Sequence, residues 1–493
     1  MSAQFDTVFR EIEVYDGTGA APVTADLAIE GDRIAAIGSV AGSARETVNG
    51  KGLAIAPGFI DVHTHDDFAA VKYNDMAFKL TGGVTTCIVG NCGFGAAPFA
   101  AAAVMAKTLH PDFTLAPWDG YRGYTEILER NPPGTNIGVL IGHGTARLAA
   151  MGAANRAPTS AEMAAMKATV AEGLEAGALG ISTGLVYDPG RFANTAEIVE
   201  LAKLLRGTGA LYATHMRDES QGLLTSVREA IEIGEKAGIP VQISHHKASG
   251  RTAWGKVGES LKIIEEAQRR GLDVHADQYP YTAGSTILAA IFREGKLRGV
   301  SGDLRPEDVV IASTAKHPEW EGKSLADLAA SMKCSMEEAA TRILAEDSGV
   351  TAILHAMCEE DVRTVMRHPS TMIGSDGIPT LEGKPHPRLY GTFARVLGRY
   401  ARDEKLFSLA EGVHRMTGFA ARKFGLRDRG VLREGAIADL VLFDPRRIID
   451  RGTWENPKVT PDGIEAVYVN GAKAVSSGKP IGARTGRVLR RGR

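Results

Sequence analysis

The sequence has little of several features that mark large protein classes. Its 493 residues include only four cysteines, Cys87, Cys92, Cys334 and Cys358, too few for the disulfide framework of a small secreted protein. Lys and Arg number 57 and Asp and Glu 59, so the net charge of -2 offers no positive excess for nucleic acid or an anionic membrane. No apolar run approaches the ~18 residues of a membrane-spanning helix. The composition therefore predicts a soluble globular protein with no nucleic-acid or membrane partner.

The ends of the sequence carry no recognisable targeting signal. Asp6, Glu11 and Glu13 stand where a secretory signal would have a basic segment leading into an apolar one. We therefore expect a cytoplasmic protein. The basic stretch at 484–493 is short, and we interpret it as a solvated tail rather than a binding arm. Nothing in the sequence specifies an oligomeric state.

The middle of the chain alternates between short apolar runs and helical patterns. The runs predict eight strands, at 59–63, 85–90, 136–142, 179–182, 211–215, 241–245, 273–277 and 371–375. Helical patterns between them include 160–176, 195–206, 219–237 and 259–270. Eight strands alternating with helices are typical of an α/β fold of the (β/α)8 TIM-like barrel type. An open doubly wound sheet is the alternative.

The two ends of the chain have a different texture from the middle. Short alternating strands and turn dipeptides such as Asp16-Gly17 and Asn470-Gly471 indicate β-structure at both ends. We therefore predict a small β-sandwich domain formed from both termini, residues 1–56 and 421–493. The barrel is predicted to span 57–420. Residues 290–346 are predicted to form an inserted subdomain or lid before the last barrel strand, with a helix over 324–345.

Side chains that bind metal ions follow several of the predicted strands. They stand at or just after the ends of the first, second, fifth, sixth and eighth strands: His63 and His65, Cys92, His215, His245, and Asp376. Residues two apart on a strand point to the same side, so His63 and His65 lie together. Barrel enzymes build their active sites at the carboxyl ends of the strands. A mixed His, Cys and Asp set there suits zinc or a similar ion.

This arrangement resembles the amidohydrolase superfamily, and the resemblance covers nearly the whole chain. The superfamily also has a small sandwich built from both ends, and the segment 435–445 looks like its usual return into that sandwich. Many members bridge two metals with a modified Lys at the end of the fourth strand. The segment 180–190 contains no Lys, whereas Cys92 offers a thiolate that can take the bridging role.

Four further motifs make the resemblance more specific. They are Gly184-Leu-Val-Tyr-Asp-Pro, Ser244-His-His-Lys, Tyr279-Pro-Tyr-Thr-Ala-Gly-Ser285 and Pro387-Arg-Leu-Tyr-Gly-Thr-Phe. Together with Cys92, these motifs resemble those of the N-acyl-D-amino-acid deacylases, or D-aminoacylases. The resemblance implies a zinc-dependent hydrolase. It would act on a small-molecule partner, an N-acyl-D-amino acid, and release a carboxylate and a free D-amino acid. The preference for the D form comes from the resemblance alone.

The resemblance also implies a role for each matching residue. Cys92, His215 and His245 would hold a tight Zn²⁺. The weaker second ion would be held by His63, His65, Asp376 and the shared Cys92. Asp376 would serve as catalytic base and then acid. The substrate would be contacted by Arg388 at its carboxylate and by Lys247, Tyr187, Tyr279, Ser285 and His143. Arg293 would reach an acidic side chain such as that of N-acyl-D-glutamate, unless it only pairs with Glu294.

Other interpretations stay open at this point. A cyclic amidase of the hydantoinase or dihydroorotase type would require the missing Lys. A non-catalytic hydantoinase-like scaffold would have lost metal ligands that this chain retains. Tyr187, Tyr279 and His143 could have packing roles only. A purely structural role is expected for Cys87, His246, His275, His355 and His414.

Overall fold

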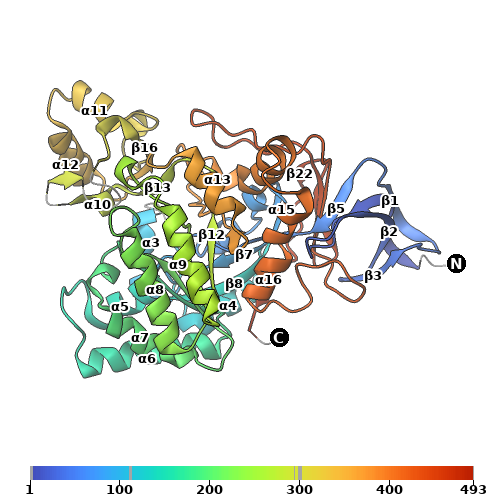
Figure 1. Cartoon of the computed structure of the whole chain (residues 1–493), viewed down its shortest axis with the longest axis horizontal. Coiled ribbons are helices and arrows are strands. Elements are labelled where there is room, and N and C mark those ends of the chain that lie inside the picture. The colour runs from blue at the N-terminus through green and yellow to red at the C-terminus, as the bar shows by residue number, and fades with distance from the viewer. Residues whose placement is uncertain (1–3, 110–113, 294, 298–302, 492–493) are drawn as a thin grey trace.

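The computed structural model describes residues 4–109, 114–293, 295–297 and 303–491 (Figure 1). Its centre is a parallel sheet of eight strands in the order β6 to β12 followed by β18. They are β6 (Phe59–Asp61), β7 (Val84–Val89), β8 (Asn136–Gly142), β9 (Gly180–Gly184), β10 (Leu211–His215), β11 (Val241–Ile243), β12 (Val274–Gln278) and β18 (Thr371–Ile373). A bridge between Thr64 and Gly377 joins the first strand to the last, so the barrel is nearly closed. The barrel prediction is confirmed, and the open-sheet alternative is wrong.

The barrel strands are buried on both faces, which explains their continuous apolar runs. Every residue of β7 and β8 is buried. One cluster fills the interior, with Ile88, Leu140 and Leu211 among its members. A larger cluster lies between the strands and the surrounding helices. Parallel sheets covered on both sides show this pattern because neither face meets water.

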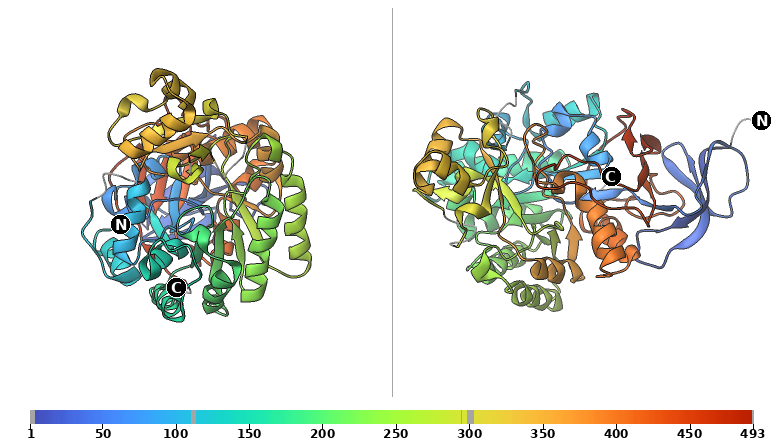
Figure 2. Two further views of the ribbon diagram at one scale, coloured as in Figure 1. Left: turned by 90° about the vertical axis from the view of Figure 1, so that its left-hand side faces the viewer. Right: turned by 90° about the horizontal axis from the view of Figure 1, so that it is seen from above.

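Helices surround the barrel (Figure 2). They are α1 (Ala69–Lys72), α2 (Ala77–Leu80), α3 (Phe99–Leu109), α4 (Gly120–Arg130), α5 (His143–Met151), α6 (Ser160–Glu175), α7 (Thr195–Ala202), α8 (Leu223–Ala237), α9 (Val257–Arg269) and α13 (Glu359–Arg367). After β18 come α14 (Arg388–Arg395), a π-helical turn (Val396–Asp403), α15 (Leu409–Arg415) and α16 (Gly418–Lys423). Helix α8 begins at Leu223, four residues later than predicted, and this leaves Glu219 in a loop at the barrel mouth.

A mixed sheet of nine strands joins the two ends of the chain. Its strands are β1 (Phe5–Val14), β2 (Val23–Glu30), β3 (Arg33–Gly38), β4 (Ala44–Asn49), β5 (Ala54–Pro57), β19 (Leu440–Phe443), β20 (Ile464–Val469), β21 (Ala472–Ser476) and β22 (Lys479–Pro480). Phe9 on β1 and Tyr468 on β20 pack edge to face, with ring centroids 5.5 Å apart, although their strands are not neighbours. The sheet therefore curls until its two halves face each other, as in a small sandwich.

The insertion between β12 and β18 lies at the opposite end of the molecule from the N-terminal strands (Figures 1 and 2). Its elements are β13 (Gly284–Ile287), α10 (Leu288–Ile291), β14 (Phe292–Arg293), β15 (Lys296–Leu297), β16 (Val309–Ser313), α11 (Leu325–Ser331), α12 (Met336–Glu346) and β17 (Thr351–Leu354). Strand β17 pairs with both β13 and β16 over a separate hydrophobic core. The unit extends on both sides of the predicted 290–346.

The single helix predicted over 324–345 is wrong, because two helices occupy this stretch. Lys333 has a φ of 51°, a left-handed backbone that interrupts the helix after α11. Ser335 then caps α12, since its side chain accepts from the Glu338 backbone N–H and Glu338 caps it in return. This reciprocal arrangement is a strong signal for a new helix start.

The basic C-terminal stretch is not a solvated tail, so that interpretation is also wrong. Residues Val488–Leu489 form β23, which runs parallel to β8 beside Ile137 and Gly138. The Ile137 N–H donates to the Arg487 carbonyl at 2.9 Å. Strand β9 pairs with β8 only from Leu140 onward, so the first half of β8 has an unpaired edge that β23 covers. Across the described ranges, no helix has both the length and the apolarity needed to cross a membrane.

Candidate metal centre

Six predicted ligands meet at the carboxyl ends of the barrel strands. Two overlapping groups have ligand atoms within 4.8 Å of one another: His63, His65, Cys92 and Asp376, and Cys92, His215 and His245. The Cys92 Sγ lies 3.3 Å from His63 Nε2, 3.8 Å from His215 Nδ1 and 3.7 Å from His245 Nε2. Asp376 Oδ1 lies 3.4 Å from His63 Nε2 and 3.2 Å from His65 Nε2. Cys92 belongs to both groups, so its sulfur lies between them.

The backbone at three of these residues is unusual. Cys92, His245 and Asp376 have φ values of 53°, 34° and 50°, in the left-handed region that L-residues rarely adopt. Such conformations persist where the surrounding structure holds them, and they cluster at functional sites. The turn at Cys92 is held from β9, since the Gly93 N–H donates to Ser182 Oγ at 3.0 Å. A side chain at Gly184 would collide with the Cys92 carbonyl, so a glycine is required where the end of β9 approaches this turn.

The electrostatics of the cluster match a cation site. Burial raises the pKa of Cys92, but His63 and hydrogen bonds from His215 and His245 outweigh it and hold that pKa well below the ordinary value. Burial likewise opposes ionisation of Asp376, while Arg388 and the histidines lower its pKa well below the ordinary value. A zinc-like ion prefers such a set of ligands, in which a buried thiolate and a buried carboxylate lie among imidazoles. The residues therefore fit such an ion.

Sequence reasoning missed a carboxylate behind His63. Asp277 is the penultimate residue of β12, and its Oδ1 lies 3.1 Å from His63 Nδ1 and accepts from the His245 backbone N–H at 2.8 Å. Carboxylates in this position fix the tautomer and ring orientation of a metal-binding histidine. The sequence signal that could have identified Asp277 was its position at the end of a predicted strand.

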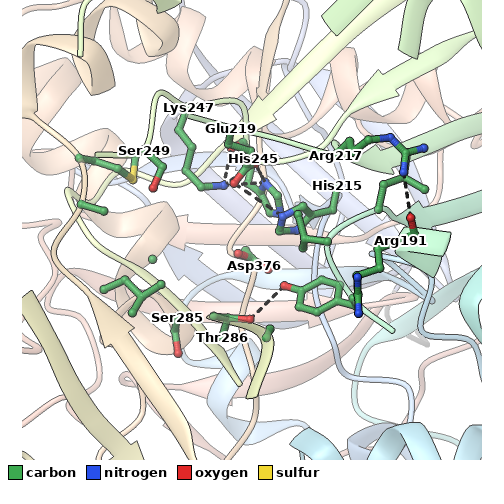
Figure 3. A pocket seen from close by; sticks show the side chains of 18 of the residues that line it. Arg191, His215, Arg217, Glu219, His245, Lys247, Ser249, Ser285, Thr286 and Asp376 are labelled. Carbon is green, nitrogen blue, oxygen red and sulfur yellow. Dashed lines mark hydrogen bonds and ion pairs between the residues drawn. The ribbon is translucent and has the colours of Figure 1, made fainter. Parts of the chain in front are cut away.

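A second carboxylate, Glu219, was also missed. Its Oε1 lies 2.9 Å from His245 Nδ1 and 2.7 Å from Lys247 Nζ, and its Oε2 lies 3.6 Å from His215 Nε2 (Figure 3). The sequence pattern placed this residue in a helix rather than in a loop, which hid its role. The only local sequence signal for its role was its position four residues after His215, the last residue of a predicted strand.

A buried lysine lies behind the first barrel strand. Lys79 is 1% exposed, and its Nζ contacts Asp61 Oδ2 at 2.7 Å and Asp66 Oδ2 at 3.3 Å. The same Nζ donates to Thr64 Oγ1 and to Ser375 Oγ, at 2.9 and 3.0 Å. This network joins the segments that carry His63, His65 and Asp376.

A cavity of about 250 Å³ opens beside the metal-binding groups (Figure 3). Eight of the predicted site residues line it, and six of these come from outside the insertion, as does Glu219: Tyr187, His215, Glu219, His245, Lys247, Tyr279 and Asp376. Ser285 and Arg293 from the insertion, together with Thr286, Leu354 and Ala356, complete one side. The Tyr187 hydroxyl lies 3.1 Å from Thr286 Oγ1, which joins the barrel side of the cavity to the insertion.

Arg388 lies at the start of α14, next to this cavity. Its guanidinium contacts Asp376 Oδ2 at 2.8 Å and stacks over the Tyr279 ring at 4.5 Å. The side chain is 1% exposed, yet its Nε and Nη1 atoms have no hydrogen-bond partner in the protein. Unpaired buried N–H groups are costly, so these two atoms require a partner from outside the chain.

Of two further predicted substrate residues, His143 lies outside the lining of the cavity and Arg293 lies within it. His143 is fully buried outside the lining of this cavity, and its Nε2 contacts Glu197 Oε1 at 2.9 Å. Arg293 lines the cavity and donates to the Val186 carbonyl, whereas its proposed ion-pair partner Glu294 lies outside the described residues. Cys87 packs in the core, and His246 is buried against Ser260.

Comparison with known proteins places this geometry in context. Residues 46–475 match the model of the amidohydrolase family. The chain is 41% identical over 492 residues to the D-aminoacylase of Alcaligenes xylosoxydans xylosoxydans, covering 99% of this chain and 98% of that protein. It is 40% identical over 500 residues to the N-acyl-D-glutamate deacylase of the same organism, covering 100% and 98%.

A solved structure agrees with the fold, and that structure contains zinc. The N-acyl-D-glutamate deacylase of Bordetella bronchiseptica, in complex with zinc and a phosphonate inhibitor that mimics the tetrahedral intermediate, superposes with a TM-score of 0.88. It is 39% identical, and the match covers 99% of each chain.

Proposed function

Since the chain belongs to the amidohydrolase family, we propose that it hydrolyses the amide bond of N-acyl-D-amino acids to a carboxylate and a free D-amino acid. One observation carries the proposal: the Asp376 carboxylate lies between the metal-binding histidines and Arg388, at the wall of the cavity. A hydrolytic centre and a site for a substrate carboxylate therefore adjoin each other. A cyclic amidase of the hydantoinase type is disfavoured, because the segment 180–190 at the end of the fourth barrel strand contains no Lys.

In this proposal, Cys92, His215 and His245 hold a tight zinc. A weaker second ion is held by His63, His65, Asp376 and the shared Cys92. Bound zinc supplies a Lewis acid for the amide carbonyl and lowers the pKa of a coordinated water to about 7. The cysteine pKa, already held low by its neighbours, favours the thiolate form that a metal ligand must have.

Asp376 is proposed to move the proton in both halves of the reaction. As a carboxylate it accepts a proton from the attacking water, and it then delivers this proton to the leaving nitrogen. Delivery is required because an amine leaves readily only when it is protonated. The contacts of Asp376 with His65 and Arg388 fix its two oxygens in place for this work.

Arg388, Lys247 and Tyr279 are proposed to hold the carboxylate of the substrate. The unpartnered donors of Arg388 leave its guanidinium with hydrogen bonds to give to such a group, and a guanidinium pairs strongly with carboxylates. Lys247 lies near the same ring, with its Nζ 5.9 Å from the Tyr279 centroid. We also propose Ser285 and Tyr187 as substrate contacts, since both line the cavity, whereas His143 would act only from behind the cavity wall.

The direct test is a hydrolysis screen with N-acetyl-D and N-acetyl-L amino acids, in which the released amine is detected. We expect turnover of the D series that is lost on removal of zinc and restored when zinc is added back. Exclusive cleavage of the L series would contradict the proposal.

Arg293 is proposed to recognise an acidic substrate side chain, as in N-acyl-D-glutamate. Its position in the lining of the cavity supports this role. Replacing Arg293 with Leu should reduce kcat/KM on N-acetyl-D-glutamate more than on N-acetyl-D-leucine. An unchanged ratio between the two substrates would remove this assignment.

The organisation and location of the chain are also proposals. We propose a barrel of residues 57–420, a terminal sandwich of residues 1–56 and 421–493, and a lid based on 290–346. All four cysteines are free thiols, which agrees with a cytoplasmic location. Fractionation of cells expressing the chain would test that location.

A further inference from the structure

Glu219 occupies a position between two parts of the site that the proposed mechanism treats separately. It lies in the loop after β10, and its side chain is 1% exposed. One oxygen, Oε1, contacts both the His245 ring and the Lys247 ammonium, at 2.9 and 2.7 Å (Figure 3). The Glu219 carbonyl also accepts from the Ser249 N–H at 2.7 Å, which ties this loop to the one after β11.

The two histidines meet Glu219 through the ring nitrogens that face away from Cys92. His245 turns Nε2 toward the sulfur and Nδ1 toward Glu219, whereas His215 turns Nδ1 toward the sulfur and Nε2 toward Glu219. A neutral imidazole that binds a metal through one nitrogen carries its proton on the other. One carboxylate therefore faces these nitrogens of both histidines: it lies within hydrogen-bond distance of His245 Nδ1 and at ion-pair distance, 3.6 Å, from His215 Nε2.

Lys247 makes this acceptor indispensable. Its Nζ lies only 2.8 Å from His245 Nδ1, so without Glu219 two donors would face each other in a buried place. A lysine ammonium has three donors and no acceptor. The carboxylate between them resolves the conflict and places the ammonium at the cavity wall.

We infer that Glu219 is a positioning residue that couples retention of the tight zinc to recognition of the substrate carboxylate. The part of this inference that concerns the substrate carboxylate rests on the proposed function, whereas the part that concerns zinc does not. Glu219 fixes the imidazole of His245 in the tautomer that binds a metal through Nε2, and its second carboxylate oxygen favours a proton on Nε2 of His215. It also holds Lys247 where the substrate carboxylate arrives.

The test compares three single variants. Glu219→Gln keeps the size but replaces one oxygen with an NH2 donor, which must face either Lys247 or His215. We expect its zinc dissociation constant to rise roughly 10- to 100-fold, the usual result of losing such a partner. We also expect its KM for an N-acetyl-D-amino acid to rise when zinc is saturating. Lys247→Met should raise KM without lowering the affinity for zinc, because the Glu219 carboxylate then still faces both imidazoles.

Glu197→Gln is the matched control, since Glu197 is a buried glutamate that pairs with His143 and Arg147 away from the metal groups. Its zinc affinity should equal that of the wild type. Affinity is measured by competition with a chromophoric chelator, using zinc alone as the probe. Wild-type zinc affinity together with an unchanged KM in Glu219→Gln would overturn the inference.

Two additions keep the result decisive. Glu219→Asp retains the charge with a shorter reach, so it should bind zinc better than Glu219→Gln if position and charge both matter. Equal affinities in these two variants, at wild-type level, would also overturn the inference. The chelator measurement needs no turnover, so failure of the wild type to cleave any D substrate would refute the proposed function and leave the zinc result interpretable.

Discussion

Lys79 shows how a single buried charge can organise a site that it does not touch directly. Its ammonium is surrounded by the carboxylates of Asp61 and Asp66, with side-chain relative exposures of 1%, 0% and 0%. Asp61 in turn accepts from the backbone N–H of Ser375, the residue before Asp376, at 2.8 Å. The lysine therefore neutralises anions that hold the first and last barrel strands together.

Replacing Lys79 with Met should destabilise the protein strongly. The change leaves two carboxylates buried without their cation, and breaking a buried pair from one side costs about 3–5 kcal/mol. Urea unfolding of the zinc-loaded protein measures the loss. Lys262→Met, at an exposed position on α9, should change stability by less than about 0.5 kcal/mol. Equal stabilities of the two variants would show that Lys79 is not needed as a counter-charge.

The sequence predicted residues that bind a metal directly but not those that support them. His63, Cys92 and Asp376 could be found because their residue types and strand-end positions are informative on their own. Asp277, Glu219 and Lys79 could not, because an acid or a lysine is common anywhere and only its buried contacts give it a role. Those contacts join segments far apart in the chain, such as His63 and Asp277, which are separated by 214 positions.

At the scale of elements, α16 is joined to the start of β12 by a buried lysine. Lys423 Nζ contacts Asp273 Oδ1 at 2.7 Å and the Asp273 carbonyl at 3.1 Å. Burial lowers the pKa of Lys423 from 10.5 to about 8, although Asp273 opposes that shift. The pair therefore anchors the helix at the cost of burying an ammonium.

This pKa gives a testable pH dependence. Below pH 8, Lys423 is charged in both states and the cost of burial is present in full. Between about pH 8 and 10.5 the unfolded chain keeps a proton that the folded chain releases, so folding stability rises with pH. Relative to Lys423→Met, the wild type should gain up to about 1.4 kcal/mol per pH unit in this window. Unfolding in urea at pH 7, 9 and 10 measures the difference, and parallel curves would contradict the prediction.

Strand β23 should also contribute measurable stability. Deleting residues 484–493 exposes the first half of β8, including the Ile137 N–H that now donates to the Arg487 carbonyl. We expect a lower Tm and faster amide exchange at Ile137 and Gly138. Arg484→Ala, which removes only an exposed contact with Asn131, is the control and should leave both unchanged. Unchanged exchange after the deletion would mean that β23 does not protect this edge.

At the scale of the whole molecule, the barrel and the insertion share the cavity but have separate cores. Strands β13 and β17 supply Ser285, Thr286 and Leu354 to the cavity wall, and Leu354 also belongs to the core of the insertion, together with Ala352. The barrel was predictable because eight apolar runs repeat at regular spacing. The extent of the insertion was not, because its strands pair only with one another and its helices are short.

Leu325→Ala should destabilise the insertion and leave the metal centre of the barrel intact. Leu325 is fully buried in the core of the insertion, where such a change costs about 2–5 kcal/mol. We expect a higher KM and faster amide exchange within the insertion, with zinc content unchanged. Leu204→Ala, at a side chain 36% exposed on the barrel surface, is the control. Loss of zinc in Leu325→Ala would show that the two units are not separable.

The late strand β23 has a consequence for biosynthesis. Asn136 and Arg487, which bond across this contact, are separated by 351 positions in the chain. A ribosome therefore produces all eight barrel strands long before it produces the segment that covers the open edge of β8. Nascent barrels spend that interval with an exposed strand edge, which is a site for pairing with other chains. Chaperone contact during translation should therefore concentrate on β8 until residues 487–489 have emerged.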